Sequence, residues 1–190
     1  MSSKRIKLRK NQNSFPIEVF QETNLTSLDL IAEGVEKLPT AWSNLESLEN
    51  LSIQCANITE VPRELFELPK LKILKIKNGI IKALPSKLNP SKSLTNLQLN
   101  NNKLESLPTW IGELKNLDVL DLSGNKLSNL PKTFENLQNL KRLNLDRNSL
   151  ELLPEELEKL KALLHLSLDN NPWLPEEKDK IFKKFKIWFS

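Results

Sequence analysis

Apolar residues recur along this chain at one fixed spacing, and the polar positions between them repeat in the same register. Six successive segments each begin at a leucine 23 residues beyond the last, and a seventh, shortened segment begins at Leu163. The six starting residues are Leu25, Leu48, Leu71, Leu94, Leu117 and Leu140. Self-similarity at a period of this length is typical of a protein built from stacked equivalent turns. The pattern therefore predicts a solenoid.

The two halves of each repeat show different periodicities. From Leu140 to Asn148, Leu143 and Leu145 alternate with polar residues, which predicts a short strand with its leucines facing inward. The second half, as in 107–114, places a proline first and spaces its apolar residues by three, which favours a short helical or 3-10 segment. Stacked turns then give a parallel sheet on one face and short helical segments on the other.

The full pattern resembles the leucine-rich repeat family, in its 23-residue L-P-x-x-[IL]-x-x-L class found in bacterial proteins and cytoplasmic scaffolds. It is carried in one repeat by Leu117, Leu120, Leu122, Asn125, Leu127, Leu130, Pro131, Phe134 and Leu137. The resemblance extends over roughly residues 6 to 175. It implies an α/β solenoid, with a curved parallel sheet on the concave face and helical or 3-10 segments on the convex face. It also implies that the repeated asparagine buries its amide and bonds the backbone of neighbouring turns. That position holds Asn102, Asn125, Asn148 and Asn171.

We expect one domain over residues 1–190, comprising a degenerate N-terminal repeat (1–24), six repeats (25–162), a truncated repeat (163–175) and a C-terminal capping helix (176–190). Pro175 with two following glutamates is typical of a helix start. One apolar face of this helix is predicted from Ile181, Phe182, Phe185, Trp188 and Phe189. A lid on the last leucine row is the favoured interpretation, while the lysines around that face leave a membrane-surface anchor or a dimer contact open.

Departures from the repeat predict where the solenoid is irregular. Glu33, Ala56 and Gly79 replace the asparagine, so we expect a looser N-terminal half. Ser91 replaces a convex leucine after Asn89-Pro90, which predicts an irregular loop, by ordinary repeat drift or as a docking point.

The first strand and two tryptophans carry further expectations. The strand pair Ile6 and Leu8 is aligned 22 residues before Leu28 and Leu30. Trp42 stands at a core position, whereas Trp110 stands beside one and is expected to be exposed on the convex side.

Composition narrows the classes of function. A formal charge of +4 is mild for a dedicated phosphate-binding domain. The single cysteine, Cys55, excludes an intramolecular disulfide and a multi-cysteine zinc site. No apolar run is long enough to span a bilayer, and residues 1–10 lack the apolar core of a signal peptide. The chain reads as soluble and cytoplasmic as written, or exported if a signal sequence was removed, so its compartment stays open.

The sequence does not place the residues of a catalytic site close together. The only cysteine and the only histidine, Cys55 and His165, stand five repeats apart, or about 24 Å along the sheet. Ser167 and Asp169 near His165 are ordinary repeat residues, and no phosphate-binding glycine loop occurs. We therefore predict a non-enzymatic protein with no catalytic, cofactor-binding or metal-binding residues.

The remaining variable positions face outward from the strands and predict a concave surface that binds a protein or peptide. The candidate partner-binding residues are Ile73, Lys75, Gln98, Val119, Asp121, Arg142, Asn144 and His165. The chain is expected to be monomeric, without a small-molecule cofactor.

Two alternatives to concave binding remain. One is a nucleic-acid or anionic-surface binder using basic termini; the other is self-association. The basic start comprises Lys4, Arg5, Lys7, Arg9 and Lys10. Nucleic-acid binding is the less favoured interpretation, because charges on an edge strand also prevent edge-to-edge pairing.

Overall fold

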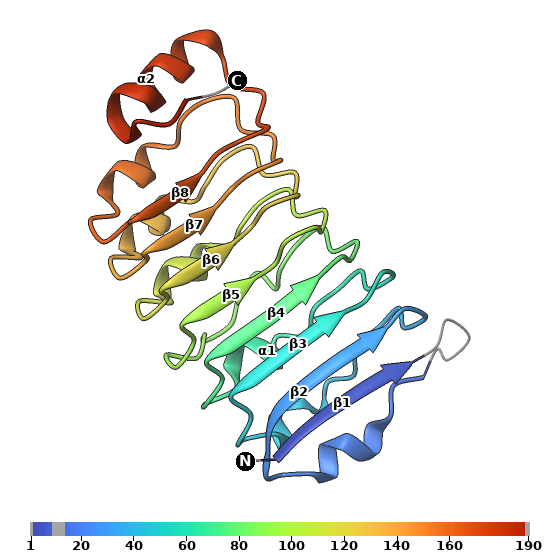
Figure 1. Cartoon of the computed structure of the whole chain (residues 1–190). Coiled ribbons are helices and arrows are strands. Elements are labelled where there is room, and N and C mark those ends of the chain that lie inside the picture. Colours follow the sequence, from blue (N-terminus) through green and yellow to red (C-terminus); the bar gives the residue numbers. More distant parts are fainter. Residues whose placement is uncertain (1, 9–13, 189–190) are drawn as a thin grey trace.

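The computed structural model describes residues 2–8 and 14–188, which form an elongated, gently curving stack of similar turns (Figure 1). Within these residues eight parallel strands build one sheet, and their spatial order is their order in the chain. The strands are β1 (Ser2–Leu8), β2 (Leu25–Ala32), β3 (Asn50–Gln54), β4 (Ile73–Lys77), β5 (Asn96–Gln98), β6 (Val119–Asp121), β7 (Arg142–Asn144) and β8 (His165–Ser167). The predicted α/β solenoid is confirmed.

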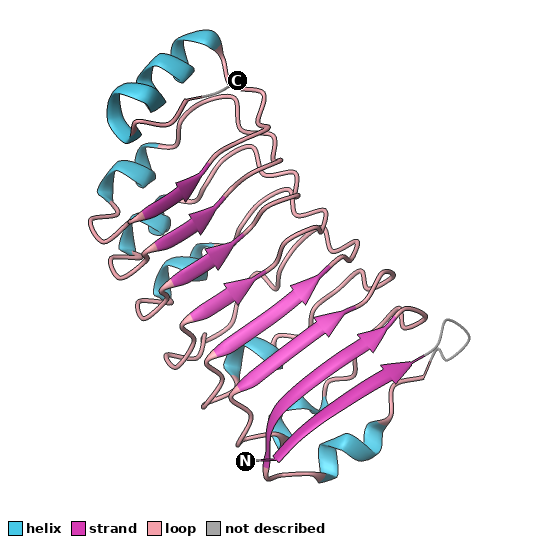
Figure 2. Cartoon of the chain, in the orientation of Figure 1, coloured by secondary structure: helices cyan, strands magenta, loops and turns pink. Residues whose placement is uncertain are grey.

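Short helical segments connect the strands on the other face of the solenoid. Figure 2 shows them behind the row of strands. The 3-10 helices are η1 (Ile17–Gln21), η2 (Ala41–Asn44), η3 (Thr109–Glu113), η4 (Lys132–Asn136) and η5 (Glu155–Lys159), and the α-helices are α1 (Glu64–Glu67) and α2 (Pro175–Phe185). A proline precedes η3, η4 and η5, where its missing N–H costs no helical hydrogen bond. The 3-10 segments fill the convex position that the three-residue apolar spacing predicted.

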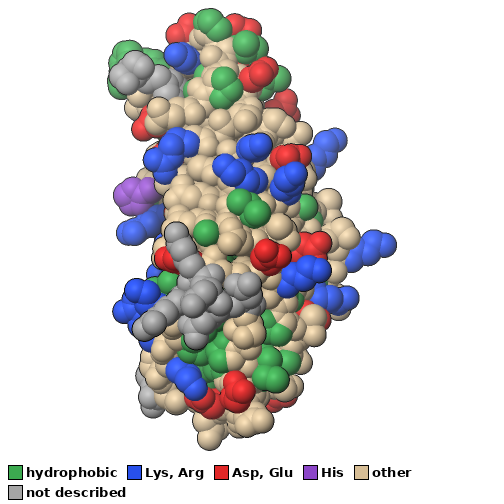
Figure 3. All heavy atoms as spheres, turned by 90° about the vertical axis from the view of Figure 1, so that its right-hand side faces the viewer, with side chains coloured by type: hydrophobic (Ala, Val, Ile, Leu, Met, Phe, Trp, Pro, Cys, Tyr) green, Lys and Arg blue, Asp and Glu red, His purple; other side chains and the backbone are tan. Residues whose placement is uncertain are grey.

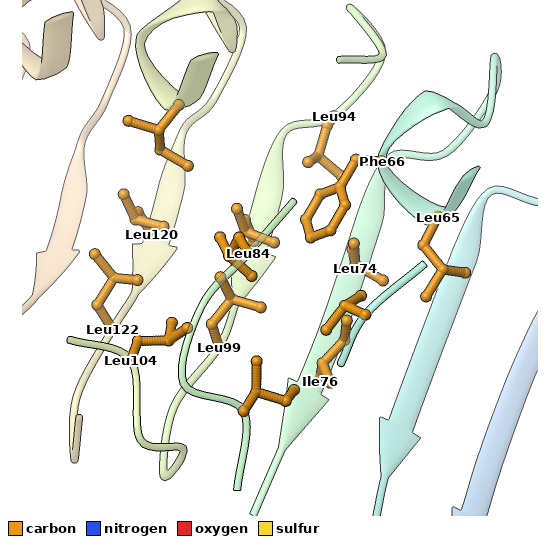
Figure 4. Close-up of a cluster of buried hydrophobic side chains, with 14 of the residues drawn as sticks. Leu65, Phe66, Leu74, Ile76, Leu84, Leu94, Leu99, Leu104, Leu120 and Leu122 are labelled. Atoms are coloured by element: carbon orange, nitrogen blue, oxygen red, sulfur yellow. The ribbon is translucent and has the colours of Figure 1, made fainter. Parts of the chain in front are cut away.

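Successive strands from β2 onward pair at the repeat length. Ile73 lies opposite Asn96, and Val119 lies opposite Arg142, each 23 residues further along the chain. Equivalent leucines therefore stack in rows inside the solenoid, and most of them are buried. Figure 4 shows part of this core, where Leu99 and Leu122 occupy equivalent places in neighbouring repeats.

The repeated asparagine joins neighbouring turns through a buried amide. The Asn125 Nδ2 group donates to the carbonyls of Leu99 at 3.0 Å and Leu122 at 2.8 Å. Its Oδ1 atom accepts the Leu104 N–H at 3.0 Å. The same three bonds recur one repeat later at Asn148. The amide thus satisfies backbone groups that the bend after each strand leaves unpaired, as the resemblance implied.

The N-terminal half is not the looser half in its strand pairing, so that expectation is wrong. Strand β2 has 8 residues and β3 and β4 have 5 each, whereas β5 to β8 have 3 each. Where asparagine is missing, the chain stays extended for longer and its backbone groups are satisfied by the neighbouring strand instead.

The register of the first strand also differs from the expected one. Ile6 lies opposite Leu30 and Leu8 opposite Ala32, a separation of 24 residues rather than the expected 22. A shift of two residues leaves the same side chains facing the core, so the apolar alternation of a strand cannot distinguish the two registers.

The repeat that begins at Leu71 is irregular, as predicted. Within the described chain no helical segment lies between β4 and β5, and Ser91 is buried with its N–H donating to the Phe66 carbonyl at 2.7 Å. The expectation for Trp110 is wrong, because this side chain is only 3% exposed. Its indole N–H donates to the Pro85 carbonyl at 2.7 Å, and its ring lies 5.0 Å from that of Phe66. Phe66 and Trp110 belong to the repeats on either side, so they meet across the repeat that lacks a helix. Trp42 is buried at its core position, as expected.

The C-terminal helix is shorter than the predicted 176–190. Helix α2 ends at Phe185, because Lys186 adopts a left-handed conformation with φ of 59°. Ile181 is buried in the core, but Trp188 is 77% exposed, and its ring lies tilted against that of Phe182 with 3.9 Å between the ring centroids. The predicted apolar face running on through Trp188 is therefore wrong, since the left-handed turn breaks the helical periodicity; Phe189 lies outside the described residues. The division of the chain into repeats and caps stays a prediction.

Candidate functional site

The eight residues predicted to bind a partner lie in two adjacent rows on the outer side of the sheet. The first row contains Ile73, Val119, Arg142 and His165, and the second contains Lys75, Gln98, Asp121 and Asn144. None of the eight is buried. Their sequence neighbours on each strand face the core, because side chains alternate along a strand. The local strand pattern therefore places all eight on one surface.

Three residues at or just after the ends of their strands are buried and do not contribute to this surface. They are Ala32, Cys55 and Ser123. Ala32 continues the inward alternation of β2, so it follows Leu28 and Leu30 into the core. At the same repeat position Asn78 and Arg147 have φ of 59° and 52°, and this left-handed turn points them outward. Burial raises the pKa of the Cys55 thiol to about 12, which leaves it protonated and unreactive.

Several polar side chains of the concave surface are held in place by hydrogen bonds. Asp121 Oδ1 accepts from the Ser123 N–H at 3.1 Å and from its hydroxyl at 2.7 Å. Asp146 Oδ1 accepts from the Ser167 hydroxyl at 2.7 Å and from the Asp169 N–H at 2.8 Å. These carboxylates are therefore oriented before any partner arrives.

Arg142 and His165 contrast with this ordered network. Both side chains are exposed, and within the described residues neither has a hydrogen-bond or ion-pair partner. They lie opposite each other on β7 and β8, about 4.8 Å apart at the backbone. Both side chains are therefore available to an incoming ligand.

A hollow of about 660 Å³ opens at the C-terminal end of the concave surface. We call it the C-terminal hollow. Six of the eight predicted residues line it, all except Ile73 and Lys75. Those two line a smaller hollow of about 260 Å³ together with Asp29 and Ser52. The structure thus separates the predicted residues into a larger group at β5 to β8 and a smaller group at β2 to β4.

Several residues that line the C-terminal hollow were missed by sequence reasoning. Among them are Leu164, Lys184, Phe185 and Ile187. A signal existed for Leu164, because the second position of a repeat is polar or charged in every earlier copy. Those copies carry Thr26, Glu49, Lys72, Thr95, Asp118 and Lys141. No signal in the sequence brings the last residues of α2 and Ile187 to this place, since they do not belong to the repeat.

The basic start of the chain is partly neutralised. Lys4 forms an ion pair with Glu22, and Arg5 pairs with Asp29 at 3.1 Å between Nε and Oδ2. Arg9 and Lys10 lie outside the described residues. On the face in Figure 3, basic side chains are interspersed with acidic ones rather than gathered in one stripe. Binding to nucleic acid through this segment stays a prediction without added support.

The described residues offer little for catalysis or metal binding. They contain no group of three or more histidine, cysteine, aspartate or glutamate side chains that is placed to hold a metal ion. Cys55 follows β3 and His165 begins β8, so five strand spacings, about 24 Å, separate them. No helix in the described part of the chain is long and apolar enough to cross a membrane.

The chain was compared with protein-family models and with solved structures. Residues 92–184 match a family model described as "Leucine-rich repeat region". The ectodomain of the plant membrane receptor kinase GASSHO1/SCHENGEN3 from Arabidopsis thaliana, in complex with Casparian strip integrity factor 2, superposes with a TM-score of 0.73. An internalin from Listeria monocytogenes gives 0.62 and a TDR receptor gives 0.68. Sequence identity is 24% in all three cases.

The coverage of these matches is unequal. They include 97%, 92% and 93% of this chain but only 26%, 56% and 36% of the respective solved chains. The chain therefore spans roughly a quarter to a half of the structures that it resembles. No curated protein matches the sequence. At this identity the likeness establishes the fold and carries no ligand with it.

Proposed function

We propose that this chain, whose residues 92–184 match a leucine-rich repeat model and whose fold resembles that of solved leucine-rich repeat proteins, is a non-enzymatic interaction module that binds a protein or peptide on the concave face of its sheet. The observation that carries the proposal is the pair of unburied side-chain rows that run across β4 to β8. The alternate residues of each strand are committed to the core, so these rows are free to vary without loss of the fold.

The dimensions of the surface suit an extended segment. Eight strands joined by seven spacings of about 4.8 Å give a surface about 34 Å long. An extended chain advances about 3.3 Å per residue, so about ten residues of a partner would cross the sheet. Residues held by internal hydrogen bonds, such as Asp121 and Asp146, would present fixed acceptors along that path.

The comparisons support a ligand-binding role without naming a ligand for this chain. The plant receptor ectodomain is described in complex with Casparian strip integrity factor 2, so a protein of this fold presents a binding surface. The buried, protonated Cys55 and its separation from His165 support the non-enzymatic part of the proposal. A monomeric state and the lack of a cofactor belong to the same proposal.

The test compares the full chain with a double variant, Ile73→Glu with Arg142→Glu. Both positions lie on the concave surface and are not buried, so the fold should persist, which circular dichroism would verify. A matched control is Lys126→Glu, which changes an exposed charge away from both hollows. Immobilised wild type and variants are incubated with extract, and recovered proteins are quantified by mass spectrometry. We expect the control to keep the wild-type partners and the double variant to lose them. Recovery of the same partners by the double variant would overturn the concave assignment.

A further inference from the structure

We infer that the C-terminal hollow is the main docking point and that it takes an extended segment of a different protein in which large apolar side chains stand beside acidic ones. This inference rests on the proposed concave function and makes it specific. It follows from two independent features of the hollow. One is an apolar wall that interrupts a charged ladder, and the other is the adjacent side chains of Arg142 and His165, neither of which has a hydrogen-bond or ion-pair partner within the described residues.

The apolar wall begins at Leu164, whose side chain is 72% exposed. The equivalent residues of earlier repeats form ion pairs between neighbouring turns, Lys72 with Glu49 at 2.9 Å and Lys141 with Asp118 at 3.1 Å. Leu164 ends that ladder with an apolar group pointing into solvent.

The leucines beside it are less covered than their counterparts. Leu163 and Leu166 are only partly buried, whereas Leu140 and Leu143 in the preceding repeat are buried. Phe185 and Ile187, from the end of α2 and the segment after it, add two more partly buried apolar side chains to the lining. An incoming apolar side chain would complete the burial that the repeat provides elsewhere.

The charge in the hollow is biased toward cations. Arg142 and His165 are exposed without partners in the described structure, and Lys184 adds a third basic group, which is ion-paired with Glu158. The one carboxylate in the lining is Asp121, whose Oδ1 atom already accepts two hydrogen bonds from Ser123. Acidic side chains on the ligand would therefore meet Arg142 and His165 with little competition from within the protein.

The apolar wall and the basic side chains of the hollow disfavour binding of a second copy of the chain or of a nucleic acid. A second copy docked by two-fold symmetry would bring the same patch against itself and would oppose Arg142 with another Arg142 or His165. A nucleic acid would satisfy the cations but would leave Leu164, Phe185 and Ile187 against a charged backbone. A segment with both apolar and acidic side chains satisfies both parts.

The experiment uses random 12-residue peptides displayed on phage and selected against the immobilised full chain. Selected peptides are synthesised with a fluorescent label, and their affinities are measured by anisotropy. We expect enrichment of Leu, Ile, Phe or Trp together with Asp and Glu. Arg142→Glu should weaken binding about tenfold or more, because it places like charges together. Leu164→Ser should weaken it about fivefold or more, because it removes the apolar contact.

Two exposed residues outside the hollow supply matched controls. Lys126→Glu reverses a charge, and Leu152→Ser replaces a leucine that is 58% exposed. Both controls should bind the peptides like wild type. All four substitutions are at exposed positions, so folding should be retained in each.

The outcomes separate this inference from the broader function. If the peptides bind Arg142→Glu and Leu164→Ser with wild-type affinity but bind Ile73→Glu or Lys75→Glu more weakly, the assignment to the C-terminal hollow is wrong. Binding on the concave surface would still be supported by that result. Peptides indifferent to every concave variant would overturn both. A dimer in light scattering that Leu164→Ser abolishes would make a second copy the occupant and would overturn the inference.

Discussion

Two asparagines at the same repeat position should contribute unequally to stability. Asn125 makes all three of its ladder bonds, two as a donor and one as an acceptor. Asn102 donates to the carbonyls of Ile76 and Leu99 at 2.9 Å each, but its Oδ1 atom is buried and has no donor. The residue one repeat earlier is Gly79, and a Cβ atom there would lie 2.7 Å from that same Oδ1 atom. The ladder therefore begins with an unpaired acceptor.

The free energies follow from these bonds. At about 1 kcal/mol for each buried hydrogen bond, Asn125→Ala should cost about 3 kcal/mol, and it leaves the Leu104 N–H without its acceptor. Asn102→Ala loses two bonds, about 2 kcal/mol, but it also removes a buried unpaired carbonyl that costs about 1 kcal/mol or more in the native state. Its net cost should be about 1 kcal/mol. The volume removed is the same in both variants, so any cavity contribution largely cancels in the comparison.

Urea unfolding followed by far-UV circular dichroism measures both variants against wild type. With a slope of about 3 kcal/mol/M, Asn125→Ala should lower the midpoint by about 1 M and Asn102→Ala by about 0.3 M. Asn125→Asp is an added control, since it keeps the acceptor for Leu104 but turns a carboxylate toward two carbonyls, and it should cost more than the alanine. Equal losses for Asn102→Ala and Asn125→Ala would refute the reasoning, because the Asn102 carbonyl would then have a hydrogen-bond partner in solution.

Three further predictions concern single side chains. The Glu177 carboxylate forms an ion pair with Lys180 and accepts a hydrogen bond from the Leu153 N–H at 3.0 Å. These contacts lower the pKa of Glu177 in the folded state. Its contribution should therefore be fully present above about pH 4.3, the usual value for glutamate, and should decrease as the pH falls through the lowered value. Urea midpoints should show Glu177→Gln more destabilised at pH 7 than at pH 3. Trp110→Phe keeps a six-membered aromatic ring, but it removes the pyrrole part of a buried side chain and leaves the Pro85 carbonyl without its indole donor. It should therefore cost at least about 1 to 2 kcal/mol, and an unchanged melting temperature would contradict this. Cys55 should react with a thiol reagent at pH 8 only after denaturant is added, and rapid labelling of the native chain, followed by absorbance, would show that the thiol is not buried.

The repeat pattern was sufficient for the features that each turn shares. The spacing of leucines predicts the strand order and the 23-residue register from β2 onward, because every repeat places the same residue at the same height in the stack. The two outward rows follow in the same way, whereas the asparagine role was implied by the resemblance to the leucine-rich repeat family. Each depends only on local alternation and on a neighbour of the same kind, so the order of residues in one repeat is enough to specify it.

Features without an equivalent in the next repeat were decided by tertiary structure. Apolar alternation has a period of two, so it could not separate the 22-residue and 24-residue registers of β1. Trp110 is buried because an adjacent repeat lacks a helix, and that vacancy lies outside its own repeat. The C-terminal hollow includes Ile187 because the left-handed turn at Lys186 ends α2 and leads the chain back beside the last strand. A periodic sequence specifies the contacts between equivalent residues of neighbouring repeats. The structure of the irregular repeat and of the two ends depends on non-equivalent residues that come into contact only in the folded chain.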